Sequence, residues 1–400
     1  MFASLLRNLR DLPSALTPSA VLSGLLVIVI GYASSLVIVF QAAANASLTP
    51  AQTSSWVLAI TVGAGVSSVV MSLWFRQPVT SAWSTPGAAL LVTSLAGYPF
   101  SEAVGAYLLA GVAVAALGFS GLFGRVMALI PTPIVLGMLA GILVRFGINA
   151  FNAIPQAPLV VIPMIGVYFV LRRRGFRAPA AVTLIVGLIL AALTGTVHLE
   201  AFTLALAAPQ LTLPTFSVAS VLGLALPLFT LALTGQNAPG QAVLRNAGYD
   251  APIDKALIVT GIVSALIAPF GGHGVTLAAI TAALVTGSEA HPDREKRYAA
   301  GVATGCWYIV TGVFGAAIVA LFAGLPPALI AATAGLGLVS AILSSLSGAM
   351  AEPDGREGAL AAFLCTAANF SLLGIGAPFW GLVFGLAVDA IMRAGRSTTR

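Results

Sequence analysis

The chain has 400 residues, of which 59% are hydrophobic and 8% charged, and its mean hydropathy is +1.03. This composition excludes an ordinary soluble domain and is typical of a protein that crosses a membrane many times. A formal net charge of +6 would suggest nucleic-acid binding in a soluble protein. Here the basic residues fall in short loops beside apolar helices, so we expect no nucleic-acid partner.

Apolar runs of about 20 residues, separated by Gly, Pro and charged residues, predict about fourteen membrane segments. In the first half these are about 18–42, 54–75, 84–96, 102–120, 130–150, 157–171 and 178–195. A polar loop at 196–215 follows. In the second half they are about 217–241, 252–268, 274–286, 297–321, 326–347, 358–371 and 376–393. We therefore expect an all-α membrane protein whose first apolar segment is a membrane span and not a signal peptide.

The basic residues orient this arrangement. With the N-terminus inside, every Lys and Arg except Arg145 falls on the inner side. Moving the count by one helix would scatter these charges over both sides. Because basic residues concentrate in cytoplasmic loops, both termini are predicted to be cytoplasmic.

The two halves of the chain resemble one another, since residues 133–141 match 327–335 in pattern. The third segment of each half is also interrupted. Seven segments is an odd number, so the second copy enters the membrane from the opposite side, which predicts an inverted repeat. We expect one membrane unit over 1–400, with the first repeat at 1–195 and the second at 216–400.

The interruptions are the most informative feature. Residues 83–87 (WSTPG) and 269–274 (PFGGHG) each precede an apolar run too short to cross a bilayer. Backbone released from a helix inside a membrane must be buried in protein or line a cavity. If both short helices start near the centre of the bilayer, their N-termini face each other and favour an anion. Ser84 and Thr85 add hydroxyl donors, and a Pro kink without a ligand is the alternative.

Polar residues on the flanking helices point to the same place. The first helix carries Tyr32, and the eighth carries Gln236 and Asn237 beside Gly and Pro. Two adjacent amides in a membrane helix are costly unless they have partners. Hydrogen bonds between helices or contacts with a substrate would both satisfy them.

Titratable groups are scarce in the predicted spans. The other carboxylates fall in loops or at the ends of segments, and Asp389 is the only one placed farther inside a span, close to its cytoplasmic end. His273 is therefore the first candidate for a proton carrier, because its side chain titrates near neutral pH. The positive end of a helix dipole would oppose an imidazolium there, and a bound carboxylate would favour it. Cys306 and Cys365 lack metal-site spacing, so we expect neither a metal nor a cofactor.

These arguments predict a substrate site made by the two breaks and the two polar helix segments. Its candidate residues are Tyr32, Ser84, Thr85, Gly87, Gln236, Asn237, Gly272, His273, Gly274 and Val275.

The same stretches resemble the benzoate:proton symporter family of bacterial inner membranes (BenE type). The resemblance runs nearly from end to end, and the strings WSTPG and QNAPG are specific when they occur together. It is carried by residues 30–35, 82–93, 138–143, 225–229, 236–240, 278–283, 289–293, 374–376 and 379–382.

The resemblance implies uptake of an aromatic carboxylate with a proton by alternating access across a bacterial inner membrane. It also implies the seven-plus-seven fold shared with uracil permeases and sulfate-type anion transporters. In that fold a core domain (helices 1–4 and 8–11, about 18–120 and 217–321) holds the substrate between broken helices 3 and 10. A gate domain (helices 5–7 and 12–14, about 130–195 and 326–393) usually forms a homodimer.

One departure concerns proton coupling. Uracil permeases use carboxylates on helices 8 and 10, where this chain has Gln236, Asn237 and His273. Their coupling scheme therefore does not carry over.

Two other classes of function remain as alternatives. The first is a transporter or channel of the same fold for another organic or inorganic anion. The sequence separates these substrates poorly, because the anion site is made of backbone groups. An intramembrane enzyme built on His273 is the other, but neither a Ser-His-Asp set nor an HExxH motif accompanies it. A membrane receptor is also disfavoured, since the chain has no soluble output domain.

Overall fold

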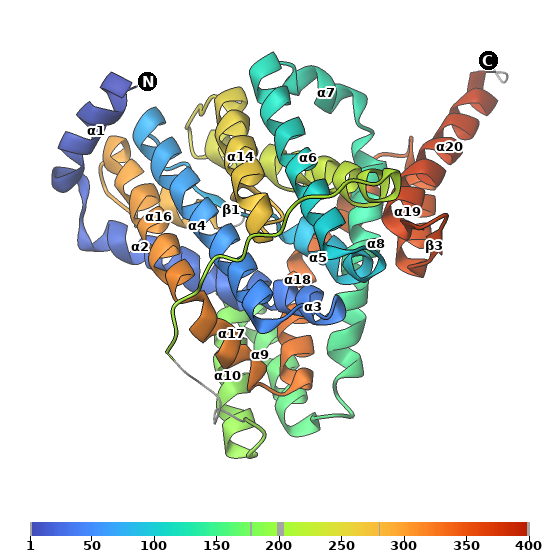
Figure 1. Cartoon of the computed structure of the whole chain (residues 1–400), viewed down its shortest axis with the longest axis horizontal. Helices are drawn as coiled ribbons and strands as arrows, with labels where there is room; N and C mark the ends of the chain where they lie inside the picture. Colours follow the sequence, from blue (N-terminus) through green and yellow to red (C-terminus); the bar gives the residue numbers. More distant parts are fainter. Residues whose placement is uncertain (1, 177, 198–203, 280, 398–400) are drawn as a thin grey trace.

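The computed structural model describes residues 2–176, 178–197, 204–279 and 281–397, and helices make up most of them (Figure 1). The elements of the first half are α1 (Phe2–Ala15), α2 (Pro18–Gly31), the π-helix η1 (Tyr32–Leu36), α3 (Val37–Asn45), α4 (Pro50–Phe75), β1 (Ser81–Trp83), α5 (Thr85–Ser94), η2 (Leu95–Gly97), α6 (Phe100–Ser120), α7 (Phe123–Leu129), α8 (Thr132–Asn152), α9 (Pro158–Arg173) and α10 (Pro179–Leu193). Those of the second half are α11 (Val218–Ser220), η3 (Val221–Ala225), α12 (Leu226–Ala232), η4 (Leu233–Asn237), α13 (Ala238–Asn246), α14 (Ile253–Ile267), η5 (Ala268–Phe270), β2 (Val275–Leu277), α15 (Ala282–Thr286), η6 (Arg294–Lys296), α16 (Tyr298–Val313), α17 (Gly315–Ala323), α18 (Pro327–Ala349), α19 (Arg356–Ala368), β3 (Ser371–Leu372), β4 (Ile375–Gly376) and α20 (Ala377–Ser397).

The prediction of a helical membrane protein is confirmed, since every predicted apolar segment contains a helix. By length and composition, six helices of the described ranges can each span a membrane, or eight if each of two bent pairs forms one span. The breaks and bends shorten the other apolar helices, so the total of fourteen crossings stays a prediction. Two helices, α1 and α7, lie outside the predicted segments.

The tenth segment differs from its prediction. The sequence suggested a helix over 274–286, but the chain forms β2 first, and α15 begins only at Ala282. Gly271 and Gly274 adopt φ of 89° and 114°, a region that glycine enters without a steric penalty. Val275 and Thr276 are β-branched and suit a strand. The turn and the strand together delay the helix.

The two breaks meet through their backbones. β1 and β2 pair antiparallel, with Ser81 opposite Leu277 and Trp83 opposite Val275. The pairing extends at both ends, where Ser84 N donates to Gly274 O (3.2 Å) and Ala278 N donates to Thr80 O (2.9 Å). Polar backbone away from water must be paired, and the two interrupted segments satisfy each other.

The helices beside this strand pair contain π-helical turns at the polar positions singled out from the sequence. The η1 turn begins at Tyr32, and the η4 turn ends at Asn237. A π turn inserts one extra residue into a helix and turns the following side chains, and such turns are common at functional sites.

The helices pack in two groups. In the first, α6 lies along α14, and α16 lies along α4 and α2. In the second, α8 lies along α18 and α19, α19 along α20, and α9 along α10. Glycines allow the closest contacts, since a Cβ at Gly261 would lie 2.3 Å from Ala115 N and one at Gly137 would lie 2.2 Å from Ala359 O.

These contacts predict the effect of adding one methyl group. Gly261→Ala should lower the free energy of unfolding by about 1–3 kcal/mol, because α6 and α14 must separate to admit it. Gly166→Ala on α9 is the matched control, since a Cβ there meets nothing within 4 Å. Thermal unfolding of the detergent-purified variants measures both. Equal stability of the two variants would show that α6 and α14 separate without cost.

An extended segment, 204–216, crosses the ends of several helices of the first group (Figure 1). Ala207 N donates to Val313 O (2.8 Å), Thr212 N to Pro269 O (2.7 Å) and Thr215 N to Ser101 O (3.0 Å). The predicted loop at 196–215 includes this segment, while its residues 198–203 lie outside the described part. The segment joins the ends of α16, η5 and α6.

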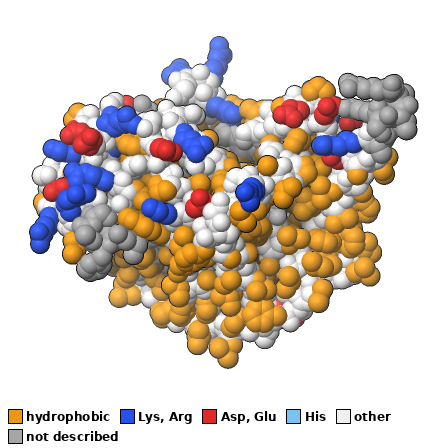
Figure 2. Space-filling model, turned by 90° about the horizontal axis from the view of Figure 1, so that it is seen from above, with side chains coloured by type: hydrophobic (Ala, Val, Ile, Leu, Met, Phe, Trp, Pro, Cys, Tyr) orange, Lys and Arg blue, Asp and Glu red, His pale blue; other side chains and the backbone are white. Residues whose placement is uncertain are grey.

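The surface separates by polarity. Figure 2 shows Lys, Arg, Asp and Glu side chains across the upper part of one face and hydrophobic side chains across the lower part. Large apolar side chains such as Leu159, Ile185 and Leu193 are more than half exposed. Exposed apolar area of this extent suits contact with lipid.

Candidate functional site

The start of α5 forms one side of the candidate site. Ser84 caps the helix, because its Oγ accepts a hydrogen bond from Gly87 N (3.1 Å). Thr85 is the first helical residue and is followed by Pro86. Its hydroxyl has no hydrogen bond to any described residue. At Gly87 a Cβ would lie 2.9 Å from Ser84 Oγ and 3.0 Å from Leu228 Cδ2, so only glycine fits between the cap and α12.

The second break differs in its donors. The sequence suggested that the backbone at 272–275 opens a helix and offers free N–H groups to an anion. In the structure Gly272 N donates to Ile267 O (3.1 Å), and Val275 N donates to Ser264 Oγ (2.9 Å). The expectation of a helix N-terminus at Gly272, Gly274 and Val275 is therefore wrong, because these residues form a turn and the start of β2.

His273 bridges α4 and the first break. Trp56 Nε1 lies 2.9 Å from His273 Nδ1, and His273 Nε2 lies 3.0 Å from Ser84 O. An indole N–H can only donate, so Nδ1 accepts, and the ring proton sits on Nε2 and is donated to Ser84. The imidazole is only 3% exposed. The geometry therefore corresponds to a neutral histidine with both nitrogens engaged.

Asn237 provides an unpaired donor. Its Oδ1 accepts a hydrogen bond from Leu277 N (3.0 Å), which fixes the orientation of the amide. Its Nδ2 is buried without a hydrogen-bond partner among the described residues, and the residue is 0% exposed. Gln236 beside it is half-buried, and its side chain makes no hydrogen bond to the described residues. A buried amide donor without a partner is costly and marks a position where a ligand or water would bind.

The amides lie beside the start of α5. A Cβ at Gly235 would be 3.2 Å from Pro86 Cγ and 3.8 Å from Leu139 Cδ2. The η4 turn therefore passes between α5 and α8. Since Leu277 is the partner of both Asn237 and Ser81, the amides, the cap and the strand pair form one cluster.

Aromatic rings line another side. The Tyr32 and Trp83 rings are 5.6 Å apart in an edge-to-face arrangement, and Trp83 contacts Tyr308 in the same way at 5.8 Å. The Tyr32 hydroxyl donates to Thr311 Oγ1 (3.1 Å), which fixes its ring. Trp83 is buried, and its Nε1 has no acceptor. These three rings form an apolar wall next to Ser84, and the Trp83 indole adds one N–H donor without an acceptor among the described residues.

The structure thus places Tyr32, Ser84 and Asn237 against the strand pair, with Thr85 and Gly87 in the first turn of α5 and Gln236 next to Asn237 in the η4 turn. The sequence did not identify Trp56, Ser264 or Tyr308. Each lies inside an apolar helix, and only its contact with the breaks marks it. Trp83 was visible as part of the first break, but its free N–H was not. The described residues contain no group of three His, Cys, Asp or Glu side chains placed to hold a metal.

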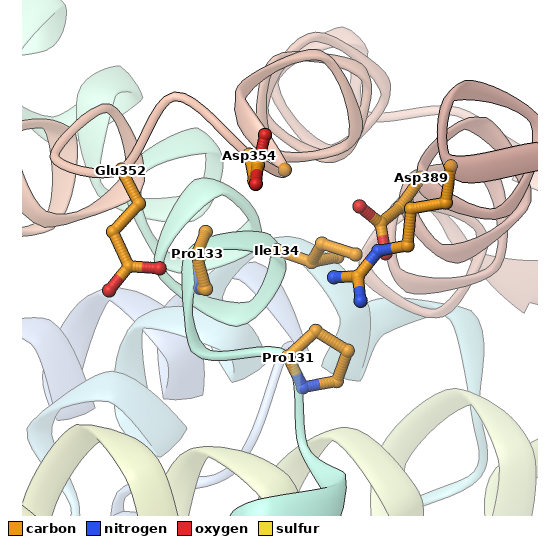
Figure 3. Close-up of a pocket in the computed structure, with 8 residues that line it drawn as sticks. Pro131, Pro133, Ile134, Glu352, Asp354 and Asp389 are labelled. Carbon is orange, nitrogen blue, oxygen red and sulfur yellow. The ribbon is translucent and has the colours of Figure 1, made fainter. Parts of the chain in front are cut away.

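A cavity of about 400 Å³ lies at the start of α8 and is not suited to an anion. Figure 3 shows Glu352, Asp354 and Asp389 around Pro131, Pro133 and Ile134. Asp389 Oδ2 accepts from Arg393 Nε at 2.9 Å. We call this the Asp389 cavity. Its described lining has three carboxylates and one guanidinium, an acidic balance that offers little to a carboxylate ligand.

Comparison with known proteins identifies the family. The sequence model of the benzoate membrane transport protein family (BenE) matches residues 14–391. The chain is 40% identical over 371 residues to the inner membrane protein YdcO of Escherichia coli, covering 93% of this chain and 95% of that protein. It is also 40% identical over 385 residues to the benzoate membrane transport protein of Acinetobacter baylyi, covering 96% and 98%.

Solved structures with much lower identity share the fold. The transmembrane domain of the cyanobacterial bicarbonate transporter BicA superposes with a TM-score of 0.61 at 16% identity, covering 94% of this chain and 96% of that one. The murine anion transporter Slc26a9 in its inward-facing state gives 0.63 at 14% identity, covering 98% and 71%. The family match spans almost the whole sequence, and its members are membrane transport proteins and not enzymes. The chain belongs to the BenE family of benzoate membrane transport proteins.

Proposed function

We propose that this protein imports benzoate, or a similar aromatic carboxylate, together with a proton across a bacterial inner membrane by alternating access. The family and the printed function of the Acinetobacter relative support the substrate class. The E. coli relative, named as an inner membrane protein, supports the location.

The observation that carries the proposal is the buried, unpartnered Nδ2 of Asn237 beside the start of α5. A carboxylate at this point accepts hydrogen bonds from Asn237 Nδ2, the Thr85 hydroxyl and Gln236. The first turn of α5, with Ser84 and Gly87, adds the positive end of its dipole. The substrate ring packs against Tyr32 and Trp83.

The second break completes the site in a supporting role. Gly272 and Gly274 form the turn before β2, which begins at Val275. His273 donates a hydrogen bond to Ser84 O and so fixes the position of Ser84. For proton coupling, His273 remains the first carrier to test. A second ring proton must bind at Nδ1, so it requires the Trp56 bond to open. Entry of the substrate carboxylate near Ser84 supplies the negative charge that favours this step.

We also propose the domain arrangement that the family resemblance implies. The repeats are 1–195 and 216–400, the core domain comprises about 18–120 and 217–321, and the gate domain comprises about 130–195 and 326–393. The separate packing of the two helix groups supports this division. Dimerisation through the gate domain and cytoplasmic placement of both termini belong to the same proposal.

A second candidate substrate is an inorganic anion, which the fold shared with a bicarbonate transporter and with Slc26a9 favours. The aromatic pair Tyr32–Trp83 argues for the aromatic acid. A small hydrated anion gains little from such a wall, whereas a benzoate ring gains apolar contact.

Uptake by the purified protein in proteoliposomes tests the proposal. Labelled benzoate is expected to accumulate inside when the outside is acidic. Once the pH gradient is collapsed, benzoate should equilibrate across the membrane without accumulating. Unlabelled benzoate and ring-substituted benzoates should compete, while bicarbonate, chloride and sulfate should not. Competition by the inorganic ions alone would assign the second function, and accumulation independent of the proton gradient would refute symport.

A further inference from the structure

A second polar cavity, of about 450 Å³, lies where the ends of α3, α5 and α19 meet the last turns of α8. We call it the Arg145 cavity. Its polar and aromatic lining consists of Asn45, Thr93, Arg145, Phe146, Asn149 and Asn369. It lies between α3 and α5 of the proposed core domain and α8 and α19 of the proposed gate domain. A cavity on this boundary is placed where relative motion of the two domains would open or close a path.

Among the described residues that line this cavity, Arg145 is the only charged one. It is half-buried and makes no ion pair and no hydrogen bond within the described part of the chain. Other arginines are engaged: Arg76 binds Asp11 (2.7 Å), Arg393 binds Asp389 (2.9 Å), and Arg297 Nη1 donates to Thr286 O (2.8 Å). The guanidinium of Arg145 therefore faces the cavity with free donors, which suit a carboxylate.

The rest of the lining fits an aromatic acid. Asn149 and Asn369 are exposed and add neutral hydrogen-bonding groups without adding charge. Asn45 Nδ2 donates to Val92 O (2.9 Å), which occupies a carbonyl at the end of α5 that would otherwise face the anion. Phe146 is 3% exposed and forms an apolar wall. One cation, several amides and one ring match a carboxylate on an apolar body.

The cavity is aligned with the substrate site. α5 begins at Thr85 in that site, and its Val92, Thr93 and Ala96 line the Arg145 cavity. On α8, Leu139 lies beside Gly235 of the η4 turn, and Arg145 follows six residues later, roughly 9 Å along the helix. The two places are therefore connected by the boundary between α5 and α8.

The two ends of α8 differ in charge. The Asp389 cavity lies at its start (Figure 3), whereas the Arg145 cavity lies near its end, and the described residues that line it include no carboxylate. In the proposed topology the end of α8 faces outward, and Arg145 is the only Lys or Arg on that side. An anion is thus attracted at one end of α8 and repelled at the other.

We propose that the Arg145 cavity is an outer vestibule that recruits the substrate carboxylate through Arg145 before it moves along α5 to the central site. The identity of the anion and the outward placement of the vestibule rest on the proposed function. The charge of the cavity and its place beside α5 and α8 do not.

A labelling experiment tests the vestibule without transport. Both native cysteines are replaced by serine (Cys306→Ser, Cys365→Ser), and Asn149→Cys places one thiol in the cavity. Membrane-impermeant methanethiosulfonates, one sulfonated and one with a trimethylammonium group, are applied to intact cells. The ratio of anionic to cationic reaction rates should fall about tenfold in Arg145→Gln, because removing one nearby charge acts oppositely on the two reagents. Arg145→Lys should retain most of the ratio.

Arg125→Gln is the matched control, since Arg125 is exposed on α7 beside the opposite end of α8. It should leave the ratio unchanged. In uptake assays Arg145→Gln should raise the KM for benzoate several-fold with little change in maximal rate. An unchanged labelling ratio, or no labelling from outside, overturns the proposal of an outer vestibule. A changed ratio with an unchanged KM for benzoate also overturns it. If the ratio falls but the wild type takes up no aromatic acid, the anion vestibule stands and the proposed function fails.

Discussion

Asn237→Leu is expected to weaken substrate binding roughly 10- to 150-fold, the effect of losing one hydrogen bond to a charged group. The side chain is fully buried, and its Nδ2 lacks a partner within the part of the chain that the structure describes. A substrate carboxylate would be that partner. Binding is measured on the detergent-purified protein by titration with benzoate, so transport is not required for the result.

Asn237 also accepts from Leu277 N, so its loss lowers stability as well. Thr85→Val separates the two effects, because the Thr85 hydroxyl has no hydrogen bond to the described residues and valine has nearly the same shape. This variant should also bind benzoate more weakly, with unchanged thermal stability. Thr234→Val is the control in the η4 turn that carries Asn237, since the Thr234 hydroxyl donates to Thr230 O (2.8 Å) one turn earlier. Wild-type affinity in both Asn237→Leu and Thr85→Val would place the carboxylate elsewhere.

His273→Gln is expected to abolish accumulation of benzoate against its gradient while leaving substrate exchange measurable. Glutamine retains hydrogen-bonding groups near Ser84 and Trp56 but cannot take up a proton near neutral pH. Exchange of labelled for unlabelled benzoate across the membrane requires binding and conformational change without net proton flow. Proteoliposomes with and without a pH gradient measure the two activities on the same preparation.

Trp56→Phe probes the same step from the other partner. It removes the N–H that lies 2.9 Å from His273 Nδ1 and keeps an aromatic ring. With the indole no longer competing with a proton for Nδ1, the pH at which accumulation is half-maximal is expected to rise. If the His273→Gln variant still accumulates benzoate with an unchanged pH profile, His273 is not the proton carrier. The proton then travels with the substrate or with water.

The helices and both breaks could be predicted because hydropathy and Gly/Pro interruptions are local properties of the sequence. The start of α5 was predicted within one residue, since Ser84, Thr85 and Pro86 form a common cap. The start of α15 was not. Whether Val275 begins a helix or a strand depends on its pairing with Trp83, a contact distant in the sequence.

The candidate site divides in the same way. The polar residues Gln236 and Asn237 could be selected because amides are unusual in a membrane helix. The roles within the site could not, because they depend on partners. His273 was selected as a candidate proton carrier at a helix start, and the sequence did not reveal that Trp56 and Ser84 engage both of its ring nitrogens. Nothing in the sequence around Trp56 indicates this bond.

The pairing of β1 with β2 has a consequence for how the chain is made. About 190 residues separate Trp83 from its partner Val275. At typical rates of synthesis, the first strand waits roughly 10–40 s before the second leaves the ribosome. During this interval the N-terminal half inserts with polar backbone that has no partner of its own, in surroundings that penalise it. The first half is thus expected to remain incompletely assembled, and most exposed to quality-control proteases, until the second half arrives.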